Sequence, residues 1–193
     1  MFCLDAASGA IKWSKHLTDD LGYDMPTWGF TGSPLVDGER LLVAAGDAGL
    51  ALNKQDGSVI WQSKNGEAGY STPFRVDRGG KELVIFSNKR GYVCVETATG
   101  AELWRIKWLT RYGVNAAVPI VKGNDLFISS GYGKGATLLR FADGEAATAP
   151  DEVWKNRDFA TQMNAAMLID GYLYGIHGNE GQDGTGLRCL HLE

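Results

Sequence analysis

The stretch Ala51-Leu52-Asn53-Lys54-Gln55-Asp56-Gly57-Ser58-Val59-Ile60-Trp61 joins a short apolar run to a polar turn that ends in glycine, and a tryptophan follows four residues later. The same phrase occurs at residues 3–13 and 94–104. A looser copy starts at Leu138 and reaches its tryptophan late, at Trp154, and a fifth copy starts at Cys189. The tryptophans are 48, 43 and 50 residues apart. A period of this length indicates a repeat architecture.

A second phrase lies upstream of the first in each repeat and consists of a strand, a polar turn and another strand. In the first complete repeat these strands are expected at 33–36 and 41–45, ahead of strands at 50–53 and 58–63. The runs are rich in Val, Ile, Leu, Tyr and Phe and are bounded by Gly, Asp, Asn and Ser, which is typical of strands and turns. Four antiparallel strands in each period correspond to one blade of a β-propeller.

The sequence therefore predicts an all-β fold, a β-propeller of about four four-stranded antiparallel blades, in a single domain of residues 1–193. We name the strands of each blade A to D in chain order. Counting strands places a partial blade at 2–17, complete blades at about 29–65, 68–108 and 113–157, and a partial blade at 162–192.

The two partial blades leave three arrangements open. The strands of 164–176 can pair with the strands of 2–16 and close a four-bladed ring. Alternatively, the chain forms an arc of a longer propeller, or a half-propeller whose terminal strands complete those of a second copy in a homodimer. Unpaired strand edges at both ends favour such pairing between copies.

The recurring tryptophan and the glycine before it have an expected structural role. A large flat side chain on the outermost strand can pack against the neighbouring blade, and the glycine supplies the positive φ that closes the hairpin. A residue that recurs at one place in every repeat is expected to serve the fold. The residues predicted to join the blades are Gly9, Trp13, Gly57, Trp61, Gly100, Trp104 and Trp154.

The phrase Leu-Asp-x-x-Ser/Thr-Gly-x-x-x-Trp, followed by a Gly-Ser-Pro or Ser-Thr-Pro strand, resembles the PQQ-like, or quinoprotein-like, β-propeller repeat family over essentially the whole chain. The family usually builds rings of eight blades, so four blades would be half a ring. It includes PQQ-dependent alcohol and sugar dehydrogenases and a periplasmic lipoprotein scaffold of outer-membrane protein assembly. The resemblance implies a periplasmic or secreted protein, although the chain shows no signal peptide at its first residues.

Composition excludes several kinds of partner. The net charge of −4 provides no basic field, so nucleic acid is not expected to bind. No apolar run approaches the roughly 18 residues of a membrane span. Cys3, Cys94 and Cys189 occupy one position of the repeat in different blades, so we expect buried thiols rather than a disulfide.

The candidate binding site lies on one face of the blades. The A–B and C–D turns are short and alike, whereas the D–A and B–C connections differ from blade to blade, and such variation usually marks the binding face of a repeat protein. We call this side the loop face. Its aromatic and polar residues are expected to surround the mouth of the channel: Trp28, Tyr70, Tyr112, Asn115, Tyr132, Asn164 and His177.

Three functions compete for the loop face. The first is a non-catalytic binding or scaffold module for a protein, peptide or saccharide. The second is a fragment of a PQQ-dependent dehydrogenase, in which the resemblance implies PQQ and calcium as cofactors and offers Trp28 as the stacking residue and Asn115 as a metal ligand. The third is a calcium site of Asn179, Glu180 and Asp183 in an acidic loop. The residues alone favour the binding module and predict no cofactor and no catalytic residue.

Overall fold

The repeated phrases form separate antiparallel sheets, which we number as blades 1 to 5. The computed structural model describes residues 1–144, 148–179 and 184–193, and this part of the chain contains strands, turns and loops but no helix. Blade 1 is the hairpin of β1 (Phe2–Leu4) and β2 (Ile11–Ser14). Blades 2 to 4 have four strands each and blade 5 has three.

The strands of the larger blades follow the chain order across each sheet. Blade 2 contains β3 (Leu35–Asp37), β4 (Arg40–Val43), β5 (Leu50–Asn53) and β6 (Val59–Gln62). Blade 3 contains β7 (Phe74–Arg78), β8 (Lys81–Asn88), β9 (Gly91–Glu96) and β10 (Glu102–Lys107). Blade 4 contains β11 (Ile120–Lys122), β12 (Asp125–Ser130), β13 (Gly135–Arg140) and β14 (Asp151–Asn156). Blade 5 contains β15 (Met167–Ile169), β16 (Tyr172–His177) and β17 (Gly186–His191).

The predicted all-β fold of about four four-stranded antiparallel blades is confirmed. Each tryptophan of the repeat occupies the same register, opposite the first residue of its phrase. The pairs are Cys3 with Trp13, Ala51 with Trp61, Cys94 with Trp104, and Leu138 with Trp154. The extra residues before Trp154 therefore lengthen the turn between β13 and β14 and leave the tryptophan in place.

Each tryptophan contacts the next blade along the chain. The indole Nε1 of Trp13 donates a 3.1 Å hydrogen bond to the carbonyl of Lys54, and Trp61 donates one of 2.9 Å to the carbonyl of Thr97. A Cβ atom on Gly57 would lie 2.7 Å from the Trp13 ring, and one on Gly100 would lie 2.6 Å from the Trp61 ring. The glycine thus provides both the positive φ of the turn and the space for the neighbouring ring.

The junction between blades 3 and 4 departs from this pattern. Trp104 packs on the ring of Phe141, with ring centroids 5.8 Å apart, and its Nε1 has no hydrogen-bond partner among the described residues. At the last junction Trp154 again donates to a backbone carbonyl, that of Leu192, at 3.1 Å. The looser fourth copy of the phrase therefore replaces a backbone acceptor with an aromatic ring.

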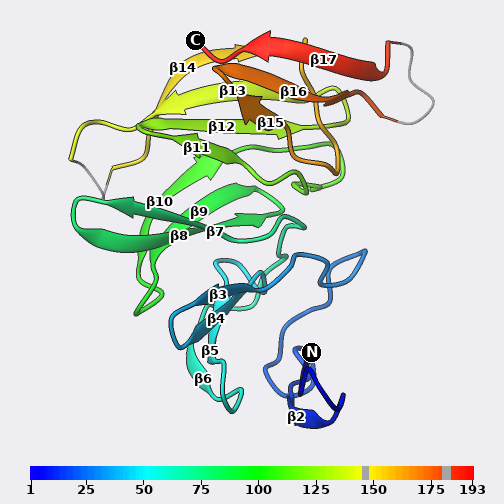
Figure 1. The fold of residues 1–193 in the computed structure, drawn as a ribbon, viewed down its shortest axis with the longest axis vertical. Helices are drawn as coiled ribbons and strands as arrows, with labels where there is room; N and C mark the ends of the chain where they lie inside the picture. Colours follow the sequence, from blue (N-terminus) through cyan, green and yellow to red (C-terminus); the bar gives the residue numbers. More distant parts are fainter. Residues whose placement is uncertain (145–147, 180–183) are drawn as a thin grey trace.

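The apolar cores lie between the blades. The described residues form four clusters of buried side chains, and each cluster lies between two successive blades. The largest joins blades 3 and 4 and includes Ile85, Tyr92, Ile128 and Trp108. Because each sheet buries its faces against its neighbours, the blades stack in chain order along the longest axis of the molecule (Figure 1).

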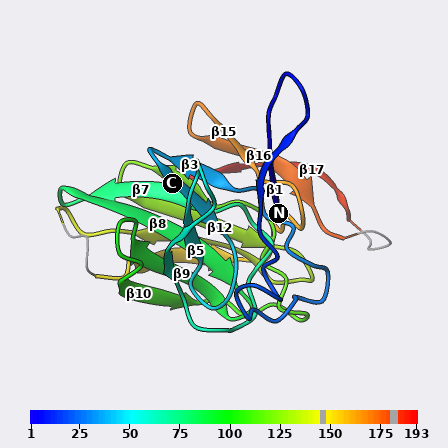
Figure 2. The same ribbon diagram turned by 90° about the horizontal axis from the view of Figure 1, so that it is seen from below.

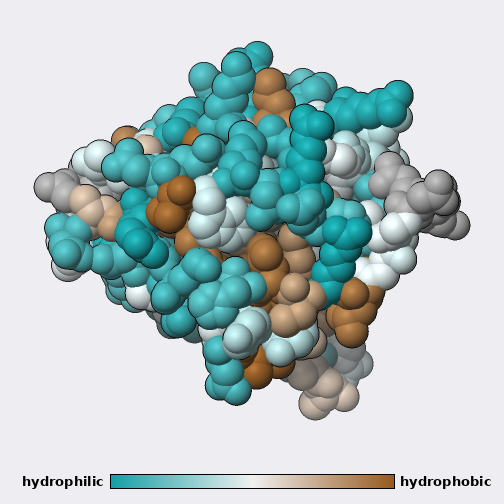
Figure 3. Space-filling model, turned by 90° about the horizontal axis from the view of Figure 1, so that it is seen from above, coloured by the Kyte–Doolittle hydropathy of each residue, from teal (hydrophilic) through white to brown (hydrophobic). Residues whose placement is uncertain are grey.

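The arrangement in which the chain closes its own four-bladed ring is wrong. Blade 1 and blade 5 are separate sheets that lie at opposite ends of the stack (Figure 1). Seen from below, the hairpin of blade 1 projects beyond the other sheets (Figure 2). Face-to-face packing carries the chain along an open arc, and it leaves apolar residues exposed at the ends, including Phe2 (67%) and Leu187 (73%). Figure 3 shows the end nearest blade 5, where apolar residues interrupt a hydrophilic surface.

The prediction of buried thiols is confirmed only for Cys94, in blade 3. Cys94 is fully buried in the core between blades 3 and 4, and burial raises the pKa of its thiol to about 12. Cys3 is half-buried, whereas Cys189 is exposed because no described strand covers that side of blade 5. All three are free thiols in different sheets.

The contact between glycine and tryptophan can be tested with two alanine substitutions at the same turn position. Gly9 and Gly100 have φ values of +71° and +72°, but only a Cβ on Gly100 would meet a tryptophan ring, that of Trp61 in the preceding blade. We expect Gly9→Ala to lower the free energy of unfolding by about 1–2 kcal/mol, the cost of a left-handed alanine. Gly100→Ala should cost about 1–3 kcal/mol more through overpacking. Urea denaturation followed by tryptophan fluorescence measures both, and equal losses would contradict the proposed role of the ring contact.

Candidate functional site

Four of the aromatic residues predicted on the loop face form two pairs. Trp28 lies edge-on to Tyr70, with ring centroids 5.5 Å apart, and Tyr112 lies edge-on to Tyr132, with centroids 4.9 Å apart. Trp28 and Tyr70 belong to the D–A connections that enter blades 2 and 3, and Tyr112 belongs to the one that enters blade 4. Tyr132 lies in the B–C connection of blade 4. The residues therefore come from successive blades, as a site on the loop face requires.

Trp28, Tyr70 and Tyr132 border a hollow of about 360 Å³, which we call the aromatic groove, and Tyr112 packs against Tyr132 outside its lining. Among the residues that the structure describes, its walls contain no charged side chain and consist of Trp28, Thr31, Tyr70, Val114, Ala116, Tyr132 and Met163. Tyr70 is buried at the base, whereas Trp28 and Met163 are more than half exposed. Exposed aromatic and thioether side chains over a buried ring form an apolar surface open to a ligand.

Tyr132 is held by a polar network between blades 4 and 5. Its backbone has a φ of +57°, which is unusual for a tyrosine, and its N–H donates a 2.7 Å hydrogen bond to Asn179 Oδ1. Gln162 Nε2 donates to the Tyr132 hydroxyl at 2.9 Å, and Asn179 Nδ2 donates to Gln162 Oε1 at 2.8 Å. The network fixes the ring at the edge of the groove. Nothing in the repeat pattern indicated Gln162, because its partners come from other connections.

Asn115 lies behind the groove and not in it. The side chain is completely buried, and its Nδ2 donates to the carbonyls of Asn88 (3.0 Å) and Trp108 (3.2 Å) while its Oδ1 accepts from Ser130 Oγ (3.1 Å). Its backbone carbonyl accepts from the N–H of Tyr70. The amide is therefore fully used within the protein, and Asn115 serves to position Tyr70.

The other two predicted residues lie toward blade 5. Asn164 is exposed and borders a separate hollow of about 200 Å³ together with Met163 and Asn179. His177 Nδ1 accepts a 3.0 Å hydrogen bond from the N–H of Ala160, which requires the neutral ring with its proton on Nε2. Burial, and to a smaller extent Arg188, lowers the pKa of His177, while Asp158 opposes the shift.

The predicted calcium site has little support in the described residues. The side-chain amide of Asn179 is committed to Tyr132 and Gln162, while Glu180 and Asp183 lie outside the described residues. Across residues 1–144, 148–179 and 184–193, no group of three or more His, Cys, Asp or Glu side chains is placed to hold a metal ion.

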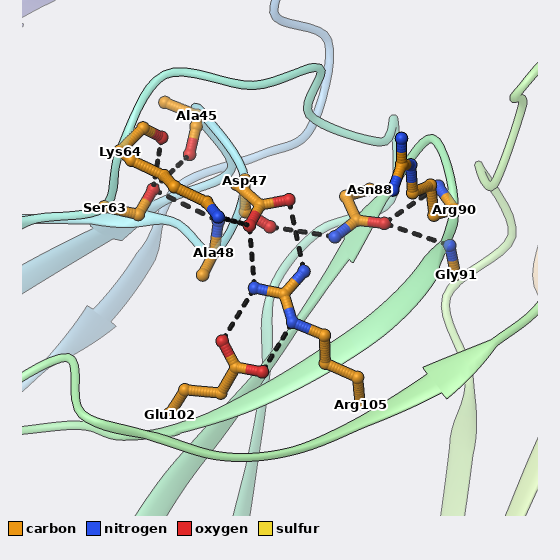
Figure 4. A network of polar contacts seen from close by, with 10 residues as sticks. All are labelled: Ala45, Asp47, Ala48, Ser63, Lys64, Asn88, Arg90, Gly91, Glu102 and Arg105. Atoms are coloured by element: carbon orange, nitrogen blue, oxygen red, sulfur yellow. Dashed lines mark hydrogen bonds and ion pairs between the residues drawn. The ribbon is translucent and has the colours of Figure 1, made fainter.

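A second, charged hollow lies on the outer part of the loop face between blades 2 and 3, and sequence analysis did not indicate it. Arg105 on β10 reaches across to Asp47 in the β4–β5 connection, with Nη2 to Oδ2 at 2.7 Å, and also binds Glu102 on its own strand (Figure 4). The hydrogen bonds from Arg105 lower the pKa of Asp47, against the opposing effect of burial. The hollow has a volume of about 570 Å³ and is also bordered by Lys64, Glu67, Lys89 and Arg90.

Comparison with known proteins agrees with this fold. The family model described as outer membrane protein assembly factor BamB, a PQQ-like repeat family, matches residues 1–188. The chain belongs to this family. No curated protein sequence matches significantly.

Solved structures show the extent of the similarity to BamB-type propellers. The crystal structure of BamB from Moraxella catarrhalis matches 99% of this chain with a TM-score of 0.71 and 16% sequence identity. The match covers 54% of that BamB chain, so the present chain spans about half its length. A structure of S. cerevisiae Dbp5 with Nup159, Gle1, IP6 and ADP matches 81% of this chain and 42% of that one, at 11% identity and a TM-score of 0.47.

The cofactors that the PQQ-like resemblance implies do not fit the residues of the aromatic groove. PQQ carries carboxylates and is held with a calcium ion, which needs oxygen ligands from carboxylate and amide groups. No charged residue lies in the described part of the groove walls, and the amide of Asn115 is buried and occupied. Trp28 already packs edge-on against Tyr70. We therefore assign no step of chemistry to PQQ or calcium here.

No helix of the described residues has the length and apolar character needed to cross a membrane.

Alanine substitutions of Asn115 and Asn164 test whether the buried hydrogen bonds of Asn115 stabilise the fold. We expect Asn115→Ala to lower the free energy of unfolding by about 2–4 kcal/mol, because it leaves buried carbonyl and hydroxyl partners without their hydrogen bonds. Asn164→Ala removes an exposed side chain and should change stability by no more than about 0.5 kcal/mol. Urea denaturation provides the comparison, and a small loss for Asn115→Ala would show that its network does not stabilise the fold.

The lowered pKa of His177 predicts that the stability of the fold depends on pH. Because its pKa is lowered in the folded protein, the neutral ring favours folding above the unfolded pKa of about 6.5, and this contribution is lost as pH falls below that value toward the folded pKa. His177→Asn keeps an acceptor oxygen for Ala160 but does not titrate. Thermal unfolding across this range should show a smaller decrease for the variant than for the unmodified protein, and parallel curves would contradict the assignment.

Proposed function

We propose that this chain is a non-catalytic protein-binding module of the BamB type, which holds an extended segment of a partner protein in the aromatic groove. The observation that carries the proposal is that Trp28, Tyr70 and Tyr132 line one hollow without a charged residue among its described walls, while Tyr112 packs edge-on against Tyr132. Rigid aromatic side chains dominate the energetics of protein interfaces because they bury a large area at low conformational cost. The groove meets this requirement before any partner binds.

The composition of the groove favours a peptide over a saccharide. Sugar hydroxyls need several polar groups beside an aromatic platform, whereas the described walls of the groove offer Thr31 as their one non-aromatic polar side chain. Apolar side chains of an extended peptide match Val114, Ala116 and Met163 without leaving polar groups unpaired.

Family membership indicates where such a partner would be found. BamB, the relative of known structure, is described as a factor of outer membrane protein assembly. A role in the cell envelope, with a segment of an outer-membrane protein or of its assembly machinery as the ligand, is therefore part of this proposal.

The proposal can be tested with fluorescein-labelled extended peptides that alternate aromatic and polar residues, as outer-membrane strands do. Trp28→Ala combined with Tyr112→Ala should weaken binding by about 2 kcal/mol or more, roughly 30-fold in Kd, as expected when aromatic anchors are lost. Fluorescence anisotropy measures the affinity. The matched control is Tyr172→Ala, which removes a similarly exposed tyrosine (43%, against 48% for Tyr112) beside an A–B turn on the opposite face.

Two outcomes would overturn the proposal. Equal loss of affinity in the control would indicate a non-specific apolar effect. Unchanged peptide binding in the double variant, or tighter binding of oligosaccharides than of every peptide, would remove the aromatic groove as a peptide site.

A further inference from the structure

The loop face carries a repeated arrangement of basic residues in blades 3 and 4. In each blade, one basic residue immediately precedes the glycine that begins strand C, and two more lie on or directly after strand D. The glycines are Gly91 and Gly135, which occupy the same place because a Cβ on either would lie 2.0 Å from a carbonyl oxygen of strand D. The six residues form what we call the basic strip: Arg90, Arg105 and Lys107 in blade 3, and Lys134, Lys155 and Arg157 in blade 4.

The strand register shows that these positions are equivalent. Arg105 pairs with Val93, two residues after Gly91, and Lys155 pairs with Thr137, two residues after Gly135. Lys107 pairs with Gly91, and a Cβ on Gly135 would lie 2.9 Å from the Cα of Arg157. The same pattern of charge therefore recurs at the same edge of two successive sheets.

Trp108 joins the two halves of the strip. Its N–H donates to the carbonyl of Arg90 at 2.9 Å, and its buried ring lies beneath two ammonium groups from blade 4. Lys134 Nζ is 4.4 Å and Lys155 Nζ is 5.1 Å from the ring centroid. Cation–π contacts hold these lysines at the seam and leave their charges available to an anion.

Several of these cations lack a negative partner. Among the described residues, Arg90, Lys107, Lys134 and Arg157 have no carboxylate within 4 Å, whereas Arg105 binds Asp47 and Glu102, and Lys155 is 3.9 Å from Glu152. Burial lowers the pKa of Lys134, and repulsion from Lys155 and Arg157 lowers it further. A bound anion would relieve this repulsion.

The blade 3 half of the strip borders a groove that also offers apolar surface. A hollow of about 500 Å³ is lined by Asn88, Arg90, Tyr92, Arg105, Ile106, Lys107 and Leu109. It shares Asn88, Arg90 and Leu109 with the hollow of about 570 Å³ beside Asp47, so the two are adjacent. Leu109 is 47% exposed at this junction. Cations that alternate with apolar side chains match a peptide in which carboxylates alternate with apolar residues.

We propose that the basic strip and its groove form a second binding site, for an acidic segment of a partner protein. Among the described residues, the six basic residues of the strip have three carboxylates within 4 Å, those of Asp47, Glu102 and Glu152, so the strip carries an excess of positive charge in a chain of net charge −4. The apolar surface between the charges favours a peptide over nucleic acid, which would need a longer basic track and aromatic faces for its bases. The site is separate from the aromatic groove and does not depend on the function proposed for it.

The probe for this proposal is a labelled extended peptide in which Asp and Leu alternate, compared with its Asn counterpart. The test variant is Lys107→Glu with Arg157→Glu, because neither residue has an ion pair to lose among the described residues. The control is Lys81→Glu with Lys122→Glu, which changes the net charge equally in the same two blades but at the A–B turns on the opposite face. Anisotropy titrations at two ionic strengths measure binding, and circular dichroism and thermal melting confirm that both variants fold.

We expect the acidic peptide to bind, added salt to weaken it, and the Asn peptide to bind more weakly. The test variant should lose about tenfold or more in affinity while the control loses about twofold or less. Trp28→Ala with Tyr112→Ala should leave this binding unchanged, which separates it from the aromatic groove. Equal losses in test and control variants, equal binding of the Asn peptide, or preferential binding of single-stranded DNA would each overturn the proposal.

Discussion

The packing of a tryptophan from one blade over the turn of the next is the contact on which the rest of the structure depends. Trp13 and Trp61 each cover a glycine and donate to a carbonyl of the following sheet. The contact works only if the glycine has both its positive φ and no Cβ. The junctions of blades 1 with 2 and of blades 2 with 3 share this contact, and Trp104 and Trp154 contact the following blade from the same strand register. The sheets therefore stack face to face in chain order, with the apolar cores between them.

Because the tryptophan contacts are made at the turns of the opposite face, the sequences of the connections on the loop face are free to vary. The turns that touch the next blade are short and alike, whereas the D–A and B–C connections contribute little to the inter-blade contacts made by tryptophan. Trp28, Tyr70 and Tyr132 can therefore line one groove, with Tyr112 packed against Tyr132, and basic residues can accumulate at the outer edge of blades 3 and 4. A rigid stack with a variable face is the physical basis of binding in repeat proteins.

The sequence predicted the aromatic groove better than its polar surroundings. Trp28, Tyr70, Tyr112 and Tyr132 stand out once the repeated tryptophans are assigned to the fold, and the structure brings them together. Asn115 looked equally suitable, but its amide turns inward to satisfy backbone carbonyls. The direction of a short polar side chain depends on unpaired groups nearby, and these are unknown until the connections are folded.

Sequence by itself determined the blade, its four strands and the register of its tryptophan, because these features rest on local alternation, turn residues and a period that repeats. Only the tertiary structure decided that blades 1 and 5 do not pair with each other, that Gln162 and Asn179 fix Tyr132, and that Arg105 reaches Asp47 in another blade. Each of these depends on the relative placement of segments far apart in the chain. That placement follows from how the sheets pack, which no single repeat encodes.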